Sequence, residues 1–538
     1  MTEATSGAGD RGLTRAQLLK RAALGGAVLA GADLLAACGA SSTTKGTSST
    51  TAKGAPKRGG HLRVGMTGNG TAETVNPTIG AVAIDAARIL NLFEGLVWTD
   101  LHNQLRPLLA VDWAPNKDGT LWTIKLRRGV TWHNGKTFTS DDVIYSLRAM
   151  GSPANFAHPS VTTVNLKDLK KVNDYELQVP LLSPNGRLLD LFAYFNQVMI
   201  QDGEKKFSPP IGTGPFKFES FTPGRQSVFN RNADYWQGPK PYLDSLEIIS
   251  IDDPTARLNA LKSGQIDMMD SVAFPDAKAE LAAPSGSINL YNAKTPTFYT
   301  FYMNQATAPF NDVRVRQAMM SAIDRQALID NALDGFGSLG NDIPGRGVPL
   351  FDSSLPQKHQ DIDKAKSLLK QAGHGTVDVT LTTSPIFAGF PESATLLQQQ
   401  VKPAGFNVSL KQVQPSQYLT PPPGGVYLKL QFGQDKWPIP TLQSFYTQAL
   451  VPGATYNESH ESNPAFGKML RKAIAAIDPD QQQKLWNQVQ EYQYTQGGNL
   501  IWAQPNNIDA GAKNVAGLTP GGIYELGNFQ FKNVWFTS

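Results

Sequence analysis

Few residues of this 538-residue chain have the types and spacing that catalysis or metal binding requires. Metal ligands recur one helical turn or one short loop apart, and serine hydrolases of the G-x-S-x-G type carry their nucleophile on that turn. No G-x-S-x-G segment occurs. The histidines are not spaced as ligands on one helical turn would be: His61, His102, His133, His158, His359, His374 and His460. We therefore expect no metal site, no cofactor and no catalytic site.

Two pairs of adjacent carboxylates and one glycine-rich segment are the other candidates for chemistry. Asp141-Asp142 and Asp252-Asp253 each stand where a helix is predicted to begin, so capping and dipole roles explain them better than acid–base catalysis. Residues 65–70 contain three glycines but lack the Lys-Ser/Thr of a phosphate-binding loop. Both features indicate structure and not reaction chemistry.

Cys38 is the only cysteine, so it has no partner for an intramolecular disulfide. Arg15, Lys20 and Arg21 precede a mostly apolar stretch, residues 22–37, which has the length of a signal-peptide core and is short for a membrane span. The order of charged segment, apolar segment, small residues and cysteine predicts an export signal over residues 1–37. The alternative is a small cysteine buried in an apolar helix.

The sequence Leu35-Ala36-Ala37-Cys38 resembles a bacterial lipoprotein box. That resemblance implies cleavage before Cys38 and lipid attachment to it, and therefore a chain anchored to the outer face of the cell membrane. Residues 14–20 also resemble a twin-arginine export signal, but Ala16 takes the place of the second arginine. The choice between the general secretory route and the twin-arginine route stays open.

Composition indicates a soluble, exported body on a tether. The chain is 41% hydrophobic and 17% charged, and no later apolar run is long enough to cross a membrane. Its formal net charge is +4 and its basic residues are scattered, which disfavours nucleic acid as a partner. Residues 38–58 are mostly small and polar and predict a flexible tether. About 480 residues follow, enough for two or three domains.

Periodicity predicts strands and helices in mixed order, and hence an α/β or α+β class. Alternating apolar residues predict strands over 61–66 and 121–128. A turn at Asn134-Gly135 and a capping box from Thr139 to Asp142 predict a helix that follows the second strand. Two more helices are predicted, one from the Asp253 cap to Gly264 and one with an apolar face at Val315, Ala318, Met319, Ala322 and Ile323.

Seven segments of the chain resemble one protein family in the family's own order. They are TVNPTIGAVAIDAARILNLFEGLVWTD, the stretch from LRPLLAVDW to DDVIYSLR, IGTGPFKFESF, NADYW, ARLNALKSGQIDMM, PFNDVRVRQAMMSAIDR and DKAKSLLKQAG. The family is that of the extracellular solute-binding proteins of family 5, the peptide-type receptors of ABC importers. The resemblance runs from about Gly59 to about Gln504.

This resemblance implies an α/β receptor with two lobes, an additional domain and a ligand cleft between the lobes. We expect lobe I to consist of residues 59–85, 210–292 and 500–538, the extra domain of residues 86–209, and lobe II of residues 293–499. The family resemblance also implies capture of a peptide or peptide-like solute by hinge closure and delivery to the importer's permease and ATPase subunits. We expect a monomer.

One segment departs from the family at a ligand-binding position. Peptide-binding members carry an aspartate for the ligand's α-amine in a motif like D-x-P-D-P, and the matching stretch here is residues 432–440. Aligned on Trp437 and the prolines that follow it, the amine position falls on Lys436, with Asp435 one residue away. A lysine would repel an amine.

Three interpretations of this segment stay open. Asp435 takes the amine-binding role through a shifted loop, or the protein prefers a ligand without a free amine, such as one with an anionic group, or Lys436 points to solvent. Further candidate contacts are Thr67, Tyr302, Asn304 and Trp437. The aromatic residues among them are as compatible with core positions as with a ligand wall.

Other functions are alternatives to transport. A receptor of the same fold that reports ligand to a membrane partner is the second hypothesis, and a secreted hydrolase is the third. The sequence does not separate the first two.

Overall fold

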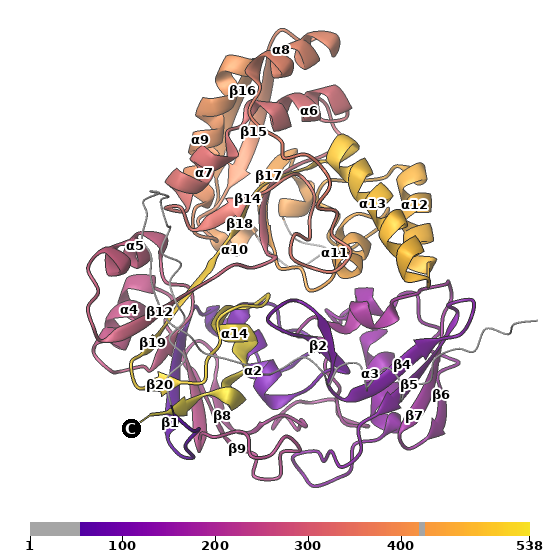
Figure 1. The fold of residues 1–538 in the computed structure, drawn as a ribbon, viewed down its shortest axis with the longest axis vertical. Helices are drawn as coiled ribbons and strands as arrows, with labels where there is room; N and C mark the ends of the chain where they lie inside the picture. Colours follow the sequence, from indigo (N-terminus) through magenta and orange to yellow (C-terminus); the bar gives the residue numbers. More distant parts are fainter. Residues whose placement is uncertain (1–53, 419–425, 538) are drawn as a thin grey trace, which may run out of the picture. The chain divides into compact units, whose positions relative to one another are not determined.

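The computed structural model describes residues 54–418 and 426–537 (Figure 1). The predicted signal segment 1–37, Cys38 and most of the predicted tether 38–58 lie outside the described residues. The last residues of that tether are described. Lys57 and Arg58 donate hydrogen bonds to the backbone carbonyls of Thr537 and Pro239, so contacts with the folded body begin just before Gly59.

A seven-stranded sheet gathers chain segments from the beginning, middle and end of the sequence. Its spatial order is β12 (Ile288–Ala293), β19 (Asn507–Ala512), β11 (Met268–Met269), β1 (His61–Met66), β10 (Ser245–Ser250), β9 (Gln226–Arg231) and β8 (Phe216–Thr222). The central strand β1 pairs in parallel with β10 and β11, and the other pairs are antiparallel. Leu62, Val64 and Met66 of β1 are fully buried, as their alternation predicted.

A six-stranded sheet forms the second large layer, with α7, α8 and α9 beside it in Figure 1. Its order is β14 (Gly337–Leu339), β18 (Asn499–Pro505), β13 (Phe298–Met303), β17 (Phe432–Trp437), β15 (Val377–Thr383) and β16 (Phe406–Gln412). The chain passes between the two large sheets at residues 294–297 and again at Asn506. The predicted boundary at residue 500 therefore falls inside β18, because that strand pairs with β13 over Tyr299 to Tyr302.

A smaller antiparallel sheet lies in the segment predicted as the extra domain. Its order is β4 (Ala110–Pro115), β5 (Leu121–Leu126), β7 (Glu176–Pro180) and β6 (Lys170–Asn173). The predicted strand over 121–128 is confirmed as β5, which ends two residues earlier, and Trp122, Ile124 and Leu126 point into a separate core. Two further ribbons pair β2 (Val97–Thr99) with β3 (Leu105–Pro107) and β20 (Val515–Ala516) with β21 (Trp535–Phe536).

The predicted helices form with the expected caps. Asp142 Oδ2 accepts the Thr139 N–H at 2.8 Å at the start of α3, and Asp253 caps α4 ahead of Pro254. The predicted apolar face of α6 is fully buried. The described α-helices are α2 (Ala83–Leu92), α3 (Ser140–Met150), α4 (Pro254–Lys262), α5 (Phe274–Ala282), α6 (Val313–Ala322), α7 (Arg325–Ala332), α8 (Ile362–Gln371), α9 (Phe390–Val401), α10 (Pro415–Tyr418), α11 (Leu442–Ala449), α12 (Pro464–Ala475), α13 (Pro479–Gln496) and α14 (Glu525–Phe529).

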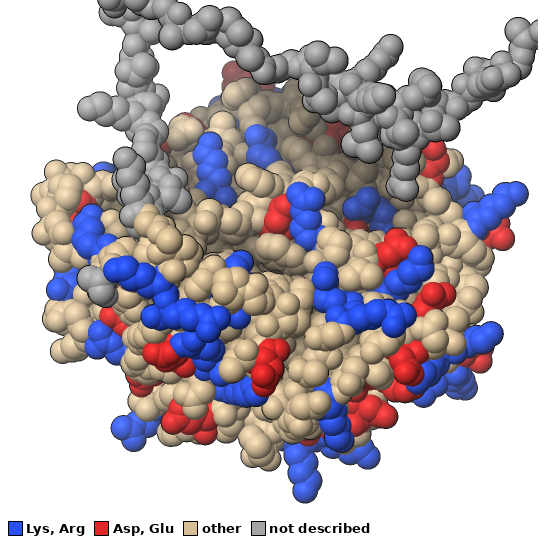
Figure 2. Space-filling model, turned by 60° about the horizontal axis from the view of Figure 1, so that its bottom comes forward, with Lys and Arg blue, Asp and Glu red and all other residues tan. Residues whose placement is uncertain are grey.

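Charges are mixed on the face that Figure 2 presents, where acidic side chains lie among the basic ones. This distribution agrees with the scattered basic residues of the sequence. No described helix has both the length and the apolar character needed to cross a membrane.

Candidate functional site

A buried ion pair joins the segments predicted as lobe I and lobe II. Lys436, next to the end of β17, places its Nζ 3.3 Å from Glu525 Oε1 at the start of α14, and both side chains are largely buried, with 23% and 10% of their surfaces exposed. Strand geometry selects Lys436 for this contact, because successive side chains of β17 point to opposite faces. Asp435 therefore points away from Glu525.

The surroundings keep Lys436 charged. Its ammonium lies 5.5 Å from the centre of the Phe387 ring, in a cation–π arrangement. Burial is the largest single influence and lowers the pKa of Lys436, but its neighbours, first among them the negative charge of Glu525, together outweigh burial and raise that pKa. Tyr299, which faces Lys436 in the β13–β17 register, and Asp270 act in the same direction.

Two buried aspartates and an arginine surround Glu525 on the lobe I side. Asp270 Oδ1 lies 3.2 Å from Arg257 Nε and accepts the Thr67 N–H, and burial raises the pKa of Asp270 to about 6. Asp509 accepts the Leu526 N–H at 2.6 Å, and burial followed by the charge of Glu525 raises the pKa of Asp509 well above its usual value. The lobe I residues near Glu525 therefore include more acidic than basic groups.

Glu525 is held by an unusual turn. Leu526, Gly527, Asn528 and Phe529 all have left-handed backbone angles, with φ between 50° and 62°, so α14 is not a right-handed helix. Each such residue other than glycine costs about 1–2 kcal/mol. Leu526 and Phe529 are fully buried, and apolar burial of this kind offsets the cost.

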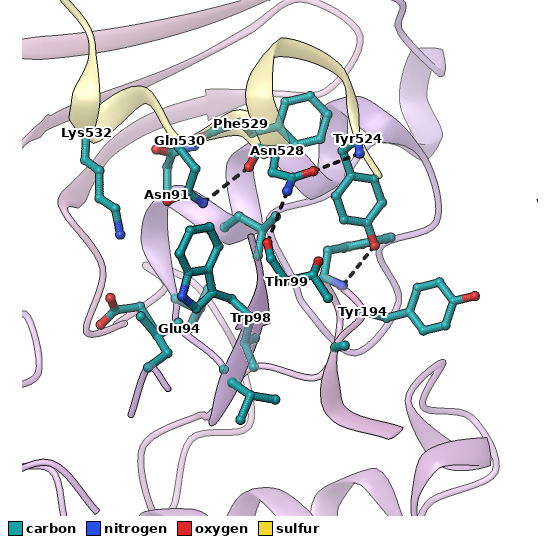
Figure 3. A pocket seen from close by; sticks show the side chains of 18 of the residues that line it. Asn91, Glu94, Trp98, Thr99, Tyr194, Tyr524, Asn528, Phe529, Gln530 and Lys532 are labelled. Carbon is teal, nitrogen blue, oxygen red and sulfur yellow. Dashed lines mark hydrogen bonds between the residues drawn. The ribbon is translucent and has the colours of Figure 1, made fainter. Parts of the chain in front are cut away.

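Hydrogen bonds with two other segments, and one within its own segment, fix this turn (Figure 3). Asn91 of α2 donates to the Phe529 carbonyl at 3.0 Å, and Asn528 donates to the Thr99 carbonyl at 3.3 Å. Asn528 Oδ1 also accepts the Tyr524 N–H at 2.9 Å. These hydrogen bonds therefore fix the conformation of the backbone that carries the Glu525 carboxylate.

Asp435 belongs to a second buried group on the other side of β17. It shares a hydrogen bond with Glu458, and burial raises the pKa of both carboxyls. Glu458 Oε2 lies 3.5 Å from the Trp437 Nε1, and the Trp437 ring packs edge-on against Phe445. Two carboxyls this close and this buried hold a proton between them.

Glu94 forms a separate polar centre, which we call the Glu94 junction. Its carboxylate accepts hydrogen bonds from Tyr235 Oη at 2.7 Å, Trp236 Nε1 at 2.8 Å and Thr213 Oγ1 at 3.0 Å. Three of the segments that resemble the family, those containing FEGL, GTGPF and NADYW, therefore meet at one carboxylate.

A cavity of about 60 Å³ borders the Glu94 junction and the turn at Glu525. Figure 3 shows the Lys532 ammonium and the Glu94 carboxylate directed toward one another across this cavity. Burial lowers the pKa of Lys532 to about 8, against the opposing charge of Glu94. The volume suits a few water molecules.

The structure brings some predicted site residues together and separates others. Thr67 contributes its N–H to Asp270, next to the ion pair, and Lys436 does not point to solvent. Tyr302 lies near Asp435 and donates to the Tyr427 carbonyl at 2.8 Å. Asn304 follows β13 and bonds within lobe II. Ligand contact by these residues stays a prediction.

Sequence reasoning missed Glu525, Asp270, Asp509 and Arg257. Arg257 lies inside a segment quoted for the family resemblance, and Asp270 follows directly after that segment, so a buried pair of opposite charge could have been suspected there. No local signal marks Glu525 as a partner of Lys436.

Comparison with known proteins identifies the family. Residues 104–454 match bacterial extracellular solute-binding proteins, family 5 Middle. The oligopeptide-binding protein AppA of Bacillus subtilis (strain 168) is 26% identical over 89% of this chain and 93% of its own length. Di/tripeptide-binding protein 2 of Pseudomonas aeruginosa (strain UCBPP-PA14) is 26% identical over 76% of this chain and 83% of its own.

A solved structure shows the same fold. That of AgaA from Agrobacterium tumefaciens R10, in complex with agropinic acid, superposes with a TM-score of 0.76 at 22% identity and covers 89% of this chain and 99% of its own. The fold is the mixed α/β fold of periplasmic binding proteins, as predicted. The chain is a binding protein and not an enzyme, and it belongs to the bacterial extracellular solute-binding proteins of family 5.

Proposed function

We propose that this protein is the substrate-binding component of an ABC importer and that it captures a peptide or peptide-like solute by hinge closure. The observation that carries the proposal is the buried Lys436–Glu525 ion pair, which connects two lobes that the chain links at 294–297 and Asn506. Two short connections of this kind are typical of hinged receptors. The proposed cleft is the space around that ion pair.

Peptide-like ligands are favoured by the names of the relatives, one an oligopeptide-binding and another a di/tripeptide-binding protein. A peptide offers main-chain donors and acceptors and charged termini to such a cleft. Because Lys436 faces Glu525, an amine of the ligand does not bind at Lys436, and an anionic group does. Asp435, hydrogen-bonded to Glu458, is not the amine-binding residue in this proposal.

The same proposal places the protein on the outer face of the cell membrane. The lipoprotein box at Cys38 and the polar segment that follows it support a lipid anchor on a tether. We expect the lobe and extra-domain boundaries given above, with the second crossing moved to Asn506, a monomeric state, and delivery of the ligand to permease and ATPase subunits.

Titration with tripeptides tests the proposal. A ligand that binds only the folded form stabilises it by about 2.7 kcal/mol at a hundredfold excess over its Kd, so the Tm should rise. Trp437, which follows Lys436 in β17, should change its fluorescence on binding. Chromatography of the recovered peptide serves as the control, because cleaved products would contradict a transport receptor.

A further inference from the structure

The Lys436–Glu525 ion pair has properties of a contact that another molecule replaces. In the described part of the chain, the Lys436 ammonium is the only recorded hydrogen-bond donor to the Glu525 carboxylate, and its distance of 3.3 Å is long. A charge-assisted hydrogen bond is normally 2.7–2.9 Å, and a carboxylate accepts several donors. Glu525 therefore retains acceptor capacity.

The neighbouring acids differ from Glu525 in this respect. Asp270 and Asp509 accept backbone N–H groups from Thr67, Ser271 and Leu526 within lobe I, so their positions do not depend on lobe II. The hydrogen bond that Glu525 accepts from Lys436 crosses the cleft. When the lobes separate, Glu525 and Lys436 both lose their partner, and each presents an unpaired charge.

The lobe I side and the lobe II side of the ion pair carry opposite charge. Lobe I presents Asp270, Asp509 and Glu525 with one arginine, Arg257, whereas lobe II presents Lys436. The left-handed turn holds Glu525 in place at a cost in backbone energy, and strain of this kind concentrates at functional sites.

We infer that Glu525 is a specificity-determining residue. In the ligand-free protein the Lys436–Glu525 ion pair closes the cleft. The ligand that separates the two side chains is a zwitterion, whose carboxylate binds Lys436 and whose ammonium binds Glu525. The inference rests on the proposed function for its ligand class, but the closure of the empty cleft does not. Each end of the ligand replaces the side chain of the same charge, so no buried charge is left without a partner.

The inter-lobe distance of the ligand-free protein tests the closure. Spin labels at Glu219→Cys of β8 and Lys366→Cys of α8, both exposed, report this distance in a Cys38→Ala background that has no other thiol. Lys436→Glu places like charges together and should shift the population to longer distances, as should the milder Lys436→Met. The double variant Lys436→Glu/Glu525→Lys should restore the original distribution.

A second inter-lobe pair provides the matched control. Lys278 of α5 lies 2.9 Å from Asp334, with 64% and 27% of their side chains exposed. Exchanging these two charges should leave the distance unchanged, because exposed pairs contribute little. An unchanged distance distribution in both Lys436→Glu and Lys436→Met would overturn the inference without affecting the proposed function.

The preference among ligands tests the second half of the inference, that the ligand is a zwitterion. A mixture of random tripeptides is offered in four forms: free, N-acetylated, C-amidated and blocked at both ends. The wild-type protein should retain the free form at least tenfold better than the others, Lys436→Met should lose the preference for a free carboxylate, and Glu525→Gln that for a free amine. Equal retention of blocked peptides would overturn the inference alone, and retention of no form would overturn the peptide proposal and the charge preference together.

Discussion

The Glu94 junction and the Lys436–Glu525 contact are both buried polar sites, but they are built in opposite ways. Glu94 accepts three hydrogen bonds of 2.7–3.0 Å from neutral donors. Among residues 54–418 and 426–537, Glu525 has one hydrogen-bond partner, a charged one, at 3.3 Å on the other lobe. The first site is complete within one set of packed segments, whereas the second depends on how the lobes are placed.

We interpret this difference as one between residues that maintain the fold and residues that, in our proposal, bind the ligand. The partners of Glu94 come from segments through which the chain resembles its family. Lys436 stands where the chain departs from the peptide-binding pattern. We therefore expect substitutions at the Glu94 junction to lower stability and substitutions at the ion pair to change binding.

The largest effect is expected for Glu94→Ala. It leaves the Tyr235, Trp236 and Thr213 donors without an acceptor, and a buried unsatisfied group costs about 1–3 kcal/mol, so we expect a loss of about 3 kcal/mol or more in the free energy of unfolding. Urea denaturation measures this loss. Glu219→Ala, at an exposed position of β8, is the control, and a similar small change in both variants would remove the contrast between the two sites.

The free energy of unfolding should depend on pH because of His133, which lies against residues 212–215, the GTGP part of a segment that meets at the Glu94 junction. Its Nδ1 accepts the Gly212 N–H and its Nε2 contacts the Gly214 carbonyl, and burial lowers the pKa of His133 to about 4. The unfolded chain binds the proton near the usual pKa of 6.5, so stability is complete above pH 6.5 and falls as the pH drops toward 4. The loss approaches about 3 kcal/mol.

Thermal unfolding at several pH values measures this slope. His133→Gln should remove the part that lies between pH 6.5 and 4, whereas substitution of the exposed His102 should not. A slope that is unchanged in His133→Gln would show that other groups cause the acid sensitivity.

At the ion pair, Lys436→Met should change the free energy of unfolding by about 1 kcal/mol or less, because the lobes of this variant are expected to separate and expose Glu525 to water. A carboxylate that stayed buried without its partner would instead cost about 3–5 kcal/mol. The affinity of Lys436→Met for a free tripeptide should nevertheless fall at least tenfold. Calorimetric titration beside urea denaturation separates the two effects. A loss of stability as large as that of Glu94→Ala would mean that Lys436 maintains the fold.

The smallest effect on the folded body is expected for Cys38→Ala. We expect release of the protein from membranes with an unchanged Tm, because the polar segment after Cys38 cannot form a core. Fractionation of membranes followed by thermal unfolding of the released protein measures both. Continued membrane attachment of a processed Cys38→Ala chain would contradict the lipoprotein hypothesis.

The local structure could be predicted from the sequence more fully than the site. Alternation located β1 and β5, and cap residues located α3 and α4, because these signals depend on neighbours in the chain. Glu525 lies 89 residues from Lys436, and the contact between them depends on four consecutive left-handed residues. Only Gly527 and Asn528 are of residue types that adopt this conformation readily, so the sequence indicates the turn only weakly.

Mass spectrometry of the native protein, purified from membranes with its own ligand, tests the central claim most directly. We predict one equivalent of an unmodified, peptide-like molecule with both a free amine and a free carboxylate, bound to the wild-type protein and absent from the Lys436→Met/Glu525→Gln variant. An identical bound molecule in both proteins, or a ligand without charged groups in the wild type, would contradict a cleft organised around Lys436 and Glu525.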